Sequence, residues 1–219
     1  MIAEITKADE FISMGGNIDE YRIVSGDDSK NFDIDVQYLF MNDWAFRRLY
    51  SVKPALHYDV GSQVQFLFYM SNFVQINFID IRNPGLSNKR FSYHKGDITD
   101  LPFKDGAIKS LSCLHVAEHI GLGRYGDKID PNGFVKACFE LSRVLAEDGM
   151  LYFAVPIGRP KVVFNAHRVL SSKQILEAFK DLRLVEFSGI TTSGSIYENV
   201  SVGMMDNEDY GVGMFRFTK

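Results

Sequence analysis

Residues that could hold a ligand follow several short apolar segments of the sequence. Asp59 and Gly61 close "HYDVG", Asp80 closes "NFID", and Asp97 and His115 follow two later apolar runs. In an open α/β sheet, ligands bind beyond the carboxyl ends of the strands, so residues at these places can converge. Asp80 lies 21 positions after Asp59, close to the spacing of about 20 at which dinucleotide-binding folds place a ribose-binding acid. The pattern predicts one ligand site built from several strand ends.

Each residue also has a purely structural interpretation. Asp59 and Gly61 are common turn residues, Asp80 and Asp97 are common at caps and strand ends, and His115 could be a core histidine bonded to a backbone carbonyl. The coincidence of three acids after three successive strands favours the ligand site.

The elements that would position these residues alternate along the chain. Apolar segments at 55–60, 74–81, 90–97, 108–116 and 149–156 predict strands, and the segments 62–72 and 131–149 predict helices between them. This alternation favours a mostly parallel sheet with helices on both faces. A helix over 171–182, capped by Ser171 or Ser172, precedes two strands at 183–190 and 210–218. No helix is evident between those two, so they can pair antiparallel.

Apolar spacing indicates which helix faces are buried. In residues 35–51 the helical spacing selects Val36, Leu39, Phe40, Trp44 and Leu49; in 131–149 it selects Phe134, Ala137, Cys138, Leu141 and Leu145. Gly149 is a natural stop for the second helix. We expect residues 1–52 to form a helical lead-in or lid and residues 53–219 to form the main domain.

Composition excludes some classes of function. The 219 residues carry a net charge of −4 with a pI near 5.7, which argues against a nucleic-acid-binding protein. The two cysteines, Cys113 and Cys138, show no zinc or disulfide spacing, so a reducing compartment is expected. Neither a secretory signal nor an apolar stretch long enough to span a membrane is evident. We therefore expect a cytoplasmic protein.

Four segments together resemble a known family. "HYDVGS", "FIDIR", "GDITDLPFKDGAIKSLSCLHVAEHI" and "ELSRVLAEDGMLYFAVP" resemble, in order and spacing, the motifs of class I S-adenosylmethionine-dependent methyltransferases over residues 55–157. The family's fold is a Rossmann-like, doubly wound, mostly parallel seven-stranded sheet with an antiparallel last strand. The run "CLHVAEHIGLGRYGDKIDPNG" also resembles a methyltransferase-like family of unknown function often linked to surface-polysaccharide genes.

The resemblance implies a role for each strand end toward S-adenosylmethionine. The turn over Asp59, Gly61, Ser62 and Gln63 would pass the methionine part. Asp80 would hold the ribose hydroxyls, with Ile81 against adenine, and Asp97 would accept from the adenine amino group while the Ile98 backbone meets the ring. His115 and Val116 would line the pocket near the sulfonium.

The turn departs from the family pattern. Gln63 and Gln65 stand where the family usually has glycines, which allow a closer backbone approach. Either Ser62 and Gln63 replace the lost contact with their own hydrogen bonds, or the site binds the cofactor weakly. The intact acids Asp80 and Asp97 favour the first account.

Methyl transfer to a hydroxyl acceptor requires a base, and histidine is the natural one. His119 is the predicted base, with Glu118 orienting it, although the histidine of such a pair can also be structural. Loops select acceptors, and the predicted acceptor-side residues are Arg124, Tyr125, Asp127 and His167. Alternatively, Arg124 pairs with Asp127 on the surface and His167, like its neighbour Arg168, serves to cap the next helix. No metal site is expected, because His115 and His119 lack a third ligand of known geometry.

Three functions remain in competition. The first is O-methylation of a sugar or another small hydroxylated acceptor. The second is a catalytically silent, methyltransferase-like scaffold, which the missing glycines favour and the acids oppose. The third is a nicotinamide-dependent oxidoreductase, which would want the three-glycine fingerprint. The oligomeric state stays open.

Overall fold

The computed structural model of the chain describes residues 9–10, 12–14 and 34–219. The chain divides into two compact units, residues 1–34 and residues 35–219. In the first unit a helical turn is described, where the Ser13 hydroxyl donates to the Glu10 carbonyl over 2.7 Å. Part of the predicted lead-in, residues 1–52, lies outside the described residues, so its boundary stays a prediction. The rest of this section concerns the second unit.

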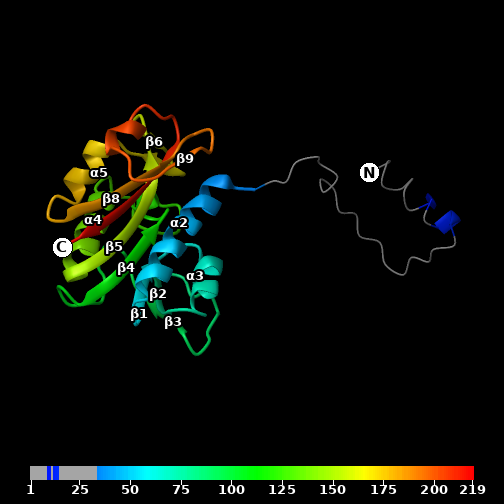
Figure 1. The fold of residues 1–219 in the computed structure, drawn as a ribbon, viewed down its shortest axis with the longest axis horizontal. Helices are drawn as coiled ribbons and strands as arrows, with labels where there is room; N and C mark the ends of the chain where they lie inside the picture. The colour runs from blue at the N-terminus through cyan, green and yellow to red at the C-terminus, as the bar shows by residue number, and fades with distance from the viewer. Residues whose placement is uncertain (1–8, 11, 15–33) are drawn as a thin grey trace. The chain divides into compact units, whose positions relative to one another are not determined.

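The second unit is built on an eight-stranded sheet (Figure 1). Its order is β3-β2-β1-β4-β5-β10-β8-β9, and the strands are β1 (Leu56–Val60), β2 (Gln75–Asp80), β3 (Phe91–Lys95), β4 (Ile108–Leu114), β5 (Leu145–Ile157), β8 (Arg183–Ile190), β9 (Ile196–Tyr197) and β10 (Gly211–Thr218). The pairs from β3 to β5 are parallel, whereas β10 is antiparallel to both β5 and β8. The predicted doubly wound sheet with an antiparallel last strand is confirmed. The two-residue β9 is an addition to the predicted seven strands.

Helices cover both faces of this sheet (Figure 1). The helices are α2 (Val36–Val52), α3 (Val64–Met70), α4 (Gly133–Val144) and α5 (Ser172–Ala178), with short 3-10 helices η1 (Ala117–His119) and η2 (Val202–Met205). Side chains of α2 and α3 join one apolar cluster, and those of α4 and α5 join the other. Among the described residues, no helix is long and apolar enough to cross a membrane.

The central strand β5 shows how the sequence separates the two clusters. Leu151, Phe153 and Val155 lie in the cluster with α4 and α5, whereas Tyr152 and Ala154 lie in the cluster with α2 and α3. Successive side chains of a strand point to opposite faces. A continuous apolar run is therefore what a strand buried on both faces requires.

The helix ends follow the predictions in part. Ser171 caps α5 in a capping box with Gln174, which satisfies free N–H groups at the first turn. Helix α4 ends at Val144, and the predicted stop Gly149 lies within β5, because the chain enters the sheet earlier than the apolar spacing suggests.

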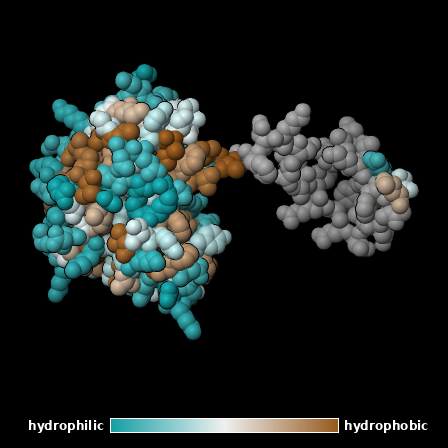
Figure 2. All heavy atoms as spheres, viewed as in Figure 1, coloured by the Kyte–Doolittle hydropathy of each residue, from teal (hydrophilic) through white to brown (hydrophobic). Residues whose placement is uncertain are grey.

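Helix α2 buries only part of the predicted face. Trp44 and Leu49 are buried as expected, whereas Val36 and Leu39 are exposed. In Figure 2 apolar atoms gather near the start of this helix on an otherwise largely polar face. In the first turn, Tyr38 packs against His115 and Gln37 donates to the Tyr210 carbonyl, whereas Val36 and Leu39 lie on the side that faces solvent.

A small hairpin that the sequence pattern did not reveal follows β5. Strands β6 (Lys161–Val163) and β7 (His167–Val169) pair antiparallel and stand apart from the main sheet (Figure 1). The buried guanidinium of Arg168 donates to the Glu118 and Ile120 carbonyls over 3.2 and 2.7 Å. The hairpin is thereby bonded to η1, beyond the end of β4.

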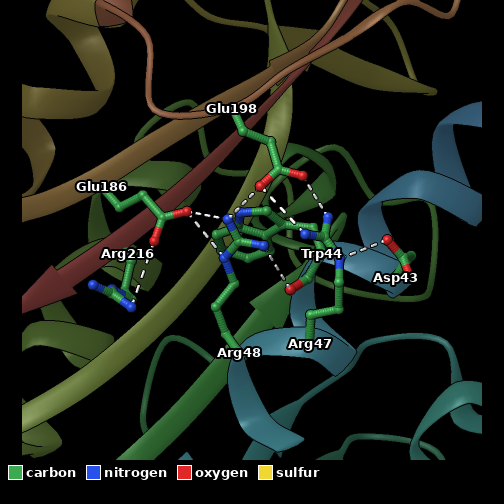
Figure 3. Close-up of polar contacts among 7 residues, drawn as sticks. All are labelled: Asp43, Trp44, Arg47, Arg48, Glu186, Glu198 and Arg216. Atoms are coloured by element: carbon green, nitrogen blue, oxygen red, sulfur yellow. Dashed lines mark hydrogen bonds and ion pairs between the residues drawn. The ribbon is translucent and has the colours of Figure 1, made fainter. Parts of the chain in front are cut away.

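An ion-pair network fastens α2 to the antiparallel half of the sheet (Figure 3). Arg48 bonds Glu186 of β8 with two guanidinium nitrogens and Glu198 with one, over 3.0 Å. Arg216 approaches the other oxygen of Glu186 at 3.5 Å. The side chains of Arg48 and Glu186 are only 10% and 8% exposed. Removing Glu186 would take the main carboxylate partner from the buried guanidinium of Arg48 and leave it the partly exposed Glu198, and breaking a buried ion pair is costly.

Replacing Glu186 with alanine should therefore destabilise the protein by about 3 to 5 kcal/mol. Asp43→Ala is the matched control, because Asp43 pairs with Arg47 where both side chains are about half exposed, and exposed pairs contribute about 0 to 1 kcal/mol. Urea unfolding of the three proteins measures both effects. Equal losses in the two variants would contradict the assigned role of the network.

Candidate functional site

Two cavities of about 840 and 400 Å³ lie where the strand-end residues converge. They share five lining residues, Gly61, Asp80, Arg82, His115 and Tyr125. The shared residues come from the ends of β1, β2 and β4 and from the loop after η1. The cavities together form one cleft at the carboxyl edge of the parallel strands, where this class of sheet binds ligands.

Asp59 lies beneath the cleft rather than in its wall. Its fully buried carboxylate accepts hydrogen bonds from the backbone N–H and hydroxyl of Ser62, over 3.0 and 2.7 Å, and from the Ser112 hydroxyl. The Ser62 hydroxyl in turn accepts from the Leu114 N–H over 2.9 Å. Asp59 thus joins the turn after β1 to strand β4, and acts on any ligand through the position of that turn.

The same carboxylate ends a buried chain of polar side chains. His57 lies between the hydroxyls of Ser110 and Ser112, at 2.8 Å from each. Because Ser112 donates to Asp59, it accepts from His57, so His57 carries its proton on Nε2 and accepts from Ser110 on Nδ1. Burial lowers the pKa of His57 to about 3, so its imidazole is neutral at physiological pH.

Gly61 is the residue of the turn that the cleft requires. Its φ is +70°, and a Cβ added there would lie 2.9 Å from a methyl carbon of Val116. A side chain at this position would meet both backbone strain and a clash. Gln63 has φ −61°, an ordinary value, and its side chain accepts a hydrogen bond from Asn42 of α2 over 2.8 Å. The turn thus needs one glycine, and Gln63 binds it to α2.

Asp80 stands at the junction of the two cavities. Its carboxylate, 10% exposed, accepts from the Arg82 backbone N–H over 2.7 Å and from the Arg82 guanidinium over 3.2 and 3.3 Å. The Arg82 side chain is 60% exposed and lies over the Tyr125 ring at 4.6 Å. The backbone bond fixes the carboxylate, whereas the longer guanidinium contacts leave a ligand able to compete for its oxygens.

Asp97 borders the larger cavity at the end of β3. One carboxylate oxygen, Oδ1, accepts from the Thr99 N–H and hydroxyl, both over 2.8 Å. This fixes the side chain while the second oxygen stays available to a ligand. Ile81, Ile98 and Val116 line the same cavity, so its wall combines apolar surface with carboxylates, among them those of Asp80 and Asp97.

His115 is held in an unusual conformation by Glu118. It has φ +56°, a region that residues other than glycine seldom adopt. Its Nδ1 lies 2.7 Å from Glu118 Oε1, and their side chains are 4% and 1% exposed. Within the part of the chain that the structure describes, His115 Nε2 and Glu118 Oε2 have no hydrogen-bond partner. Buried polar atoms are rarely left unpaired without a reason.

His119 is fixed by the hairpin. Its Nδ1 lies 2.6 Å from the Ala166 carbonyl, to which Arg124 also donates over 2.9 Å. Since a carbonyl only accepts, Nδ1 of His119 carries a proton. Its Nε2 lies 3.6 Å from the same Glu118 oxygen that bonds His115. Glu118 was predicted to orient His119, but its contact with His119 is longer than its contact with His115.

The loop after η1 is held by Asp127, whose carboxylate accepts from the backbone N–H groups of Gly121, Gly123 and Tyr125. Burial opposes the ionisation of this carboxyl, but these bonds outweigh it and lower its pKa. Tyr125 lies at the edge of the His119 ring, with ring centroids 5.6 Å apart. In the described structure Arg124 binds the hairpin rather than Asp127.

The structure brings most of the predicted site residues to one cleft. The predicted residues that line it are Gly61, Ser62, Gln63, Asp80, Ile81, Asp97, Ile98, His115, Val116, His119, Tyr125 and Asp127. The others lie behind it or on its rim: Asp59 and Glu118 are buried, Arg124 bonds the hairpin, and the His167 ring lies tilted against that of Tyr210, with centroids 4.8 Å apart. Across the described ranges, no cluster of three His, Cys, Asp or Glu side chains could hold a metal ion.

Sequence reasoning missed two contributors to the cleft and expected a third, Arg168, on its rim or as a cap of the next helix. Arg82 and Tyr38 both line it, and Tyr38 lies with its ring 5.2 Å from that of His115. Burial, with a smaller effect from the charge of Glu118, raises the pKa of Tyr38 to about 12. Arg168 acts indirectly, through the backbone of η1. The one sequence signal for Arg82 was its place directly after the "FID" strand end.

Comparisons with known proteins bear on the fold. A SAM-dependent methyltransferase from Methanosarcina mazei superposes with a TM-score of 0.55 and 14% identity, covering 78% of this chain and 96% of that one. The N-methyltransferase NodS from Bradyrhizobium japonicum, solved with S-adenosyl-L-homocysteine, gives 0.56 and 15%, covering 88% and 92%. The chain has a methyltransferase fold.

The same fold also serves another chemistry. The [4+2]-cyclase SpnF superposes with a TM-score of 0.60 and 13% identity, covering 100% of this chain and 93% of that one. A family described as a Caenorhabditis protein of unknown function, DUF268, matches residues 106–194, and no curated protein matches significantly. Fold does not determine function, so the reaction has to be argued from the cleft itself.

The buried carboxyl of Asp59 should make the stability of the protein depend on pH. Burial raises the pKa of Asp59 from 3.8 to about 6, against hydrogen bonds from Ser112 and Ser62 that lower it. The stabilisation linked to its proton is fully present below about pH 4 and is lost as the pH rises through 6. The free energy of unfolding of the wild type, minus that of Asp59→Asn, should therefore fall by up to about 3 kcal/mol between pH 4 and pH 7.

Urea unfolding of both proteins across this range measures that difference. The lowered pKa of His57 has the opposite effect, because it stabilises the folded state more at higher pH. His57 is present in both proteins, so its contribution cancels in the difference. A difference that stays constant with pH would show that Asp59 is not the buried titrating group.

Proposed function

We propose that this chain is an S-adenosylmethionine-dependent methyltransferase that O-methylates a sugar or another small hydroxylated acceptor. The observation that carries the proposal is the larger cavity of about 840 Å³, where the carboxylates of Asp80 and Asp97 stand beside an apolar patch of Ile81, Ile98 and Val116. Two fixed carboxylates beside apolar surface suit a nucleoside, which offers hydroxyl and amino donors around a flat ring. The methyltransferase fold supports the proposal.

The residues of the cleft fit the cofactor part by part. Asp80 accepts from the ribose hydroxyls in place of the longer Arg82 contacts, and the free oxygen of Asp97 accepts from the adenine amino group. Ile81, Ile98 and Val116 provide apolar contact to the ring. Gly61 borders both cavities, and Ser62 and Gln63 line the smaller one, so this turn would lie along the methionine part.

When bound, the cofactor supplies a methyl group on a positively charged sulfur, which a nucleophilic oxygen can attack. The protein's own contribution is position and proton transfer, because an in-line displacement gains much of its rate from holding two reactants together. The histidines His115 and His119 and the carboxylate of Glu118 stand beside the space where the acceptor would lie. Arg124, Tyr125, Asp127 and His167 are the proposed acceptor side, on the loop and hairpin that border it.

Residues 1–52 serve as the lead-in or lid of this site in the same proposal. Two contacts of α2 support a connection to the cleft: Tyr38 lies against His115, and Asn42 donates to Gln63 of the turn. Both place this helix beside the smaller cavity, where the methionine part and the acceptor would meet.

Binding of the product S-adenosylhomocysteine tests the proposal. Asp80→Ala should weaken its binding by about 1 to 3 kcal/mol, the usual cost of leaving hydrogen-bonding partners unpaired. Asp100→Ala is the matched control, because this exposed aspartate borders neither cavity. Isothermal titration calorimetry of the three proteins measures the affinities.

A parallel titration with NAD separates the competing functions. Wild-type protein that binds S-adenosylhomocysteine and not NAD supports the methyltransferase. Binding of neither ligand would favour a silent scaffold, binding of NAD alone an oxidoreductase, and unchanged affinity in Asp80→Ala would remove the role assigned to that residue.

A further inference from the structure

We infer that His115, rather than His119, is the general base of the site, and that Glu118 is the positioning residue that fixes its tautomer. The inference rests on the proposed function, since it names the group that would take the acceptor's proton. It uses the two unpaired polar atoms of the buried pair and the place of His115 where both cavities meet.

The tautomer of His115 follows from its partner. Glu118 Oε1 is an acceptor at 2.7 Å from His115 Nδ1, so Nδ1 carries the proton of the neutral ring and Nε2 carries the lone pair. Nε2 has no partner among the described residues, although it is buried. His115 lines both cavities, but its Nε2 is closed to solvent in this conformation. A hydroxyl at the junction would therefore reach this lone pair once a neighbouring group, such as the Tyr38 ring at 5.2 Å, moves aside.

The backbone of His115 supports a functional role. At φ +56° the residue occupies a region that costs free energy for a side chain other than glycine, and such positions cluster at active sites. The His115 N–H donates to the Ala154 carbonyl of β5 over 2.9 Å. The conformation is thus held by the sheet, and it directs the chain from β4 into η1 so that Glu118 returns to the imidazole.

His119 is less suited to the role. Its Nδ1 donates to the hairpin and its Nε2 lies 3.6 Å from the Glu118 oxygen already bonded to His115. It lines only the larger cavity. We therefore assign His119 to the connection between η1 and the hairpin.

Polar and charged groups face His115 from each neighbouring element. Glu118 and His119 lie on η1, Tyr38 on α2, Tyr125 on the following loop, and Asp80 and Arg82 at the end of β2. Tyr38, whose pKa burial raises to about 12, stays protonated and adds no charge beside the imidazole. Glu118 stabilises the imidazolium that forms when the ring takes a proton.

The proton transfer balances as follows. The acceptor's oxygen forms a bond to the methyl carbon, while the carbon–sulfur bond of the sulfonium donor breaks and leaves its electron pair on sulfur. The hydroxyl proton passes to Nε2 of His115, and the O–H electron pair stays on oxygen. The imidazolium then returns the proton to water when the products leave.

Nitrogen NMR of the histidine side chains tests this assignment without an acceptor. The protein contains five histidines, and at pH 8.5 free imidazole is neutral, so each ring reports its tautomer. The His115 signals are assigned by their loss in His115→Asn, a change that suits the positive φ because asparagine tolerates that region. His94→Asn, at an exposed position of β3, is the matched control.

Wild-type His115 should carry its proton on Nδ1, and Glu118→Ala should move most of it to Nε2, because the acceptor at Nδ1 is lost. A packing role alone would leave the tautomer unchanged in this variant. A proton on Nε2 in the wild type, or no change in Glu118→Ala, would overturn the inference.

Adding S-adenosylhomocysteine to the same samples separates this inference from the proposed function. Binding that shifts the His115 Nε2 signal and leaves His94 unmoved supports both. Binding that leaves His115 unmoved would overturn the base assignment alone. Absence of binding, with the wild-type tautomer as stated, would overturn the proposed function and with it the reaction that the base would serve.

Discussion

The buried carboxylate of Asp59 is the constraint on which the rest of the cleft depends. It accepts from Ser62 in the turn after β1 and from Ser112 in β4, so it fixes the distance between two neighbouring strand ends. A buried carboxylate is tolerated only where hydrogen bonds compensate its lost hydration, and here three donors do so. The close approach of Gly61 to Val116 and the position of His115 both follow from this connection.

A second connection shapes the part of the cleft beside η1 and the hairpin. The hairpin of β6 and β7 bonds the backbone of η1 through Arg168 and the side chain of His119 through the Ala166 carbonyl. Together with the buried Glu118, these bonds set the position of the two histidines at the end of β4. Two separate hydrogen-bond networks, one around Asp59 and one around the hairpin, thus organise the cleft on either side of His115.

The elements were predictable where one physical signal dominated. The strands of the parallel half and the closing strand 183–190 are apolar runs bounded by polar residues, and each was found in the structure within a few residues. The end of α4 was not, because the sequence from 145 to 149 continues the helical apolar spacing while β4 offers it a strand partner. The three-residue strands of the hairpin are too short to give a periodic signal.

The sequence predicted which residues line the cleft, but not which of them bond to one another. Residues directly after the strands reached the cleft because topology alone brings strand ends together. Which histidine Glu118 bonds could not be read from "HVAEH", since both lie within reach of a short 3-10 turn, and the positive φ of His115 decides it. Arg82 and Tyr38 were missed because a side chain's direction across a cleft leaves no trace in spacing.

The central claim is that Asp80 and Asp97 hold one adenosine between them. The most direct measurement is a crystal structure of the protein with S-adenosylhomocysteine. The account predicts the ribose hydroxyls on the Asp80 carboxylate and the adenine amino group within hydrogen-bonding distance of Asp97. A nucleoside bound elsewhere, or carboxylates turned away from it into solvent, would contradict the account.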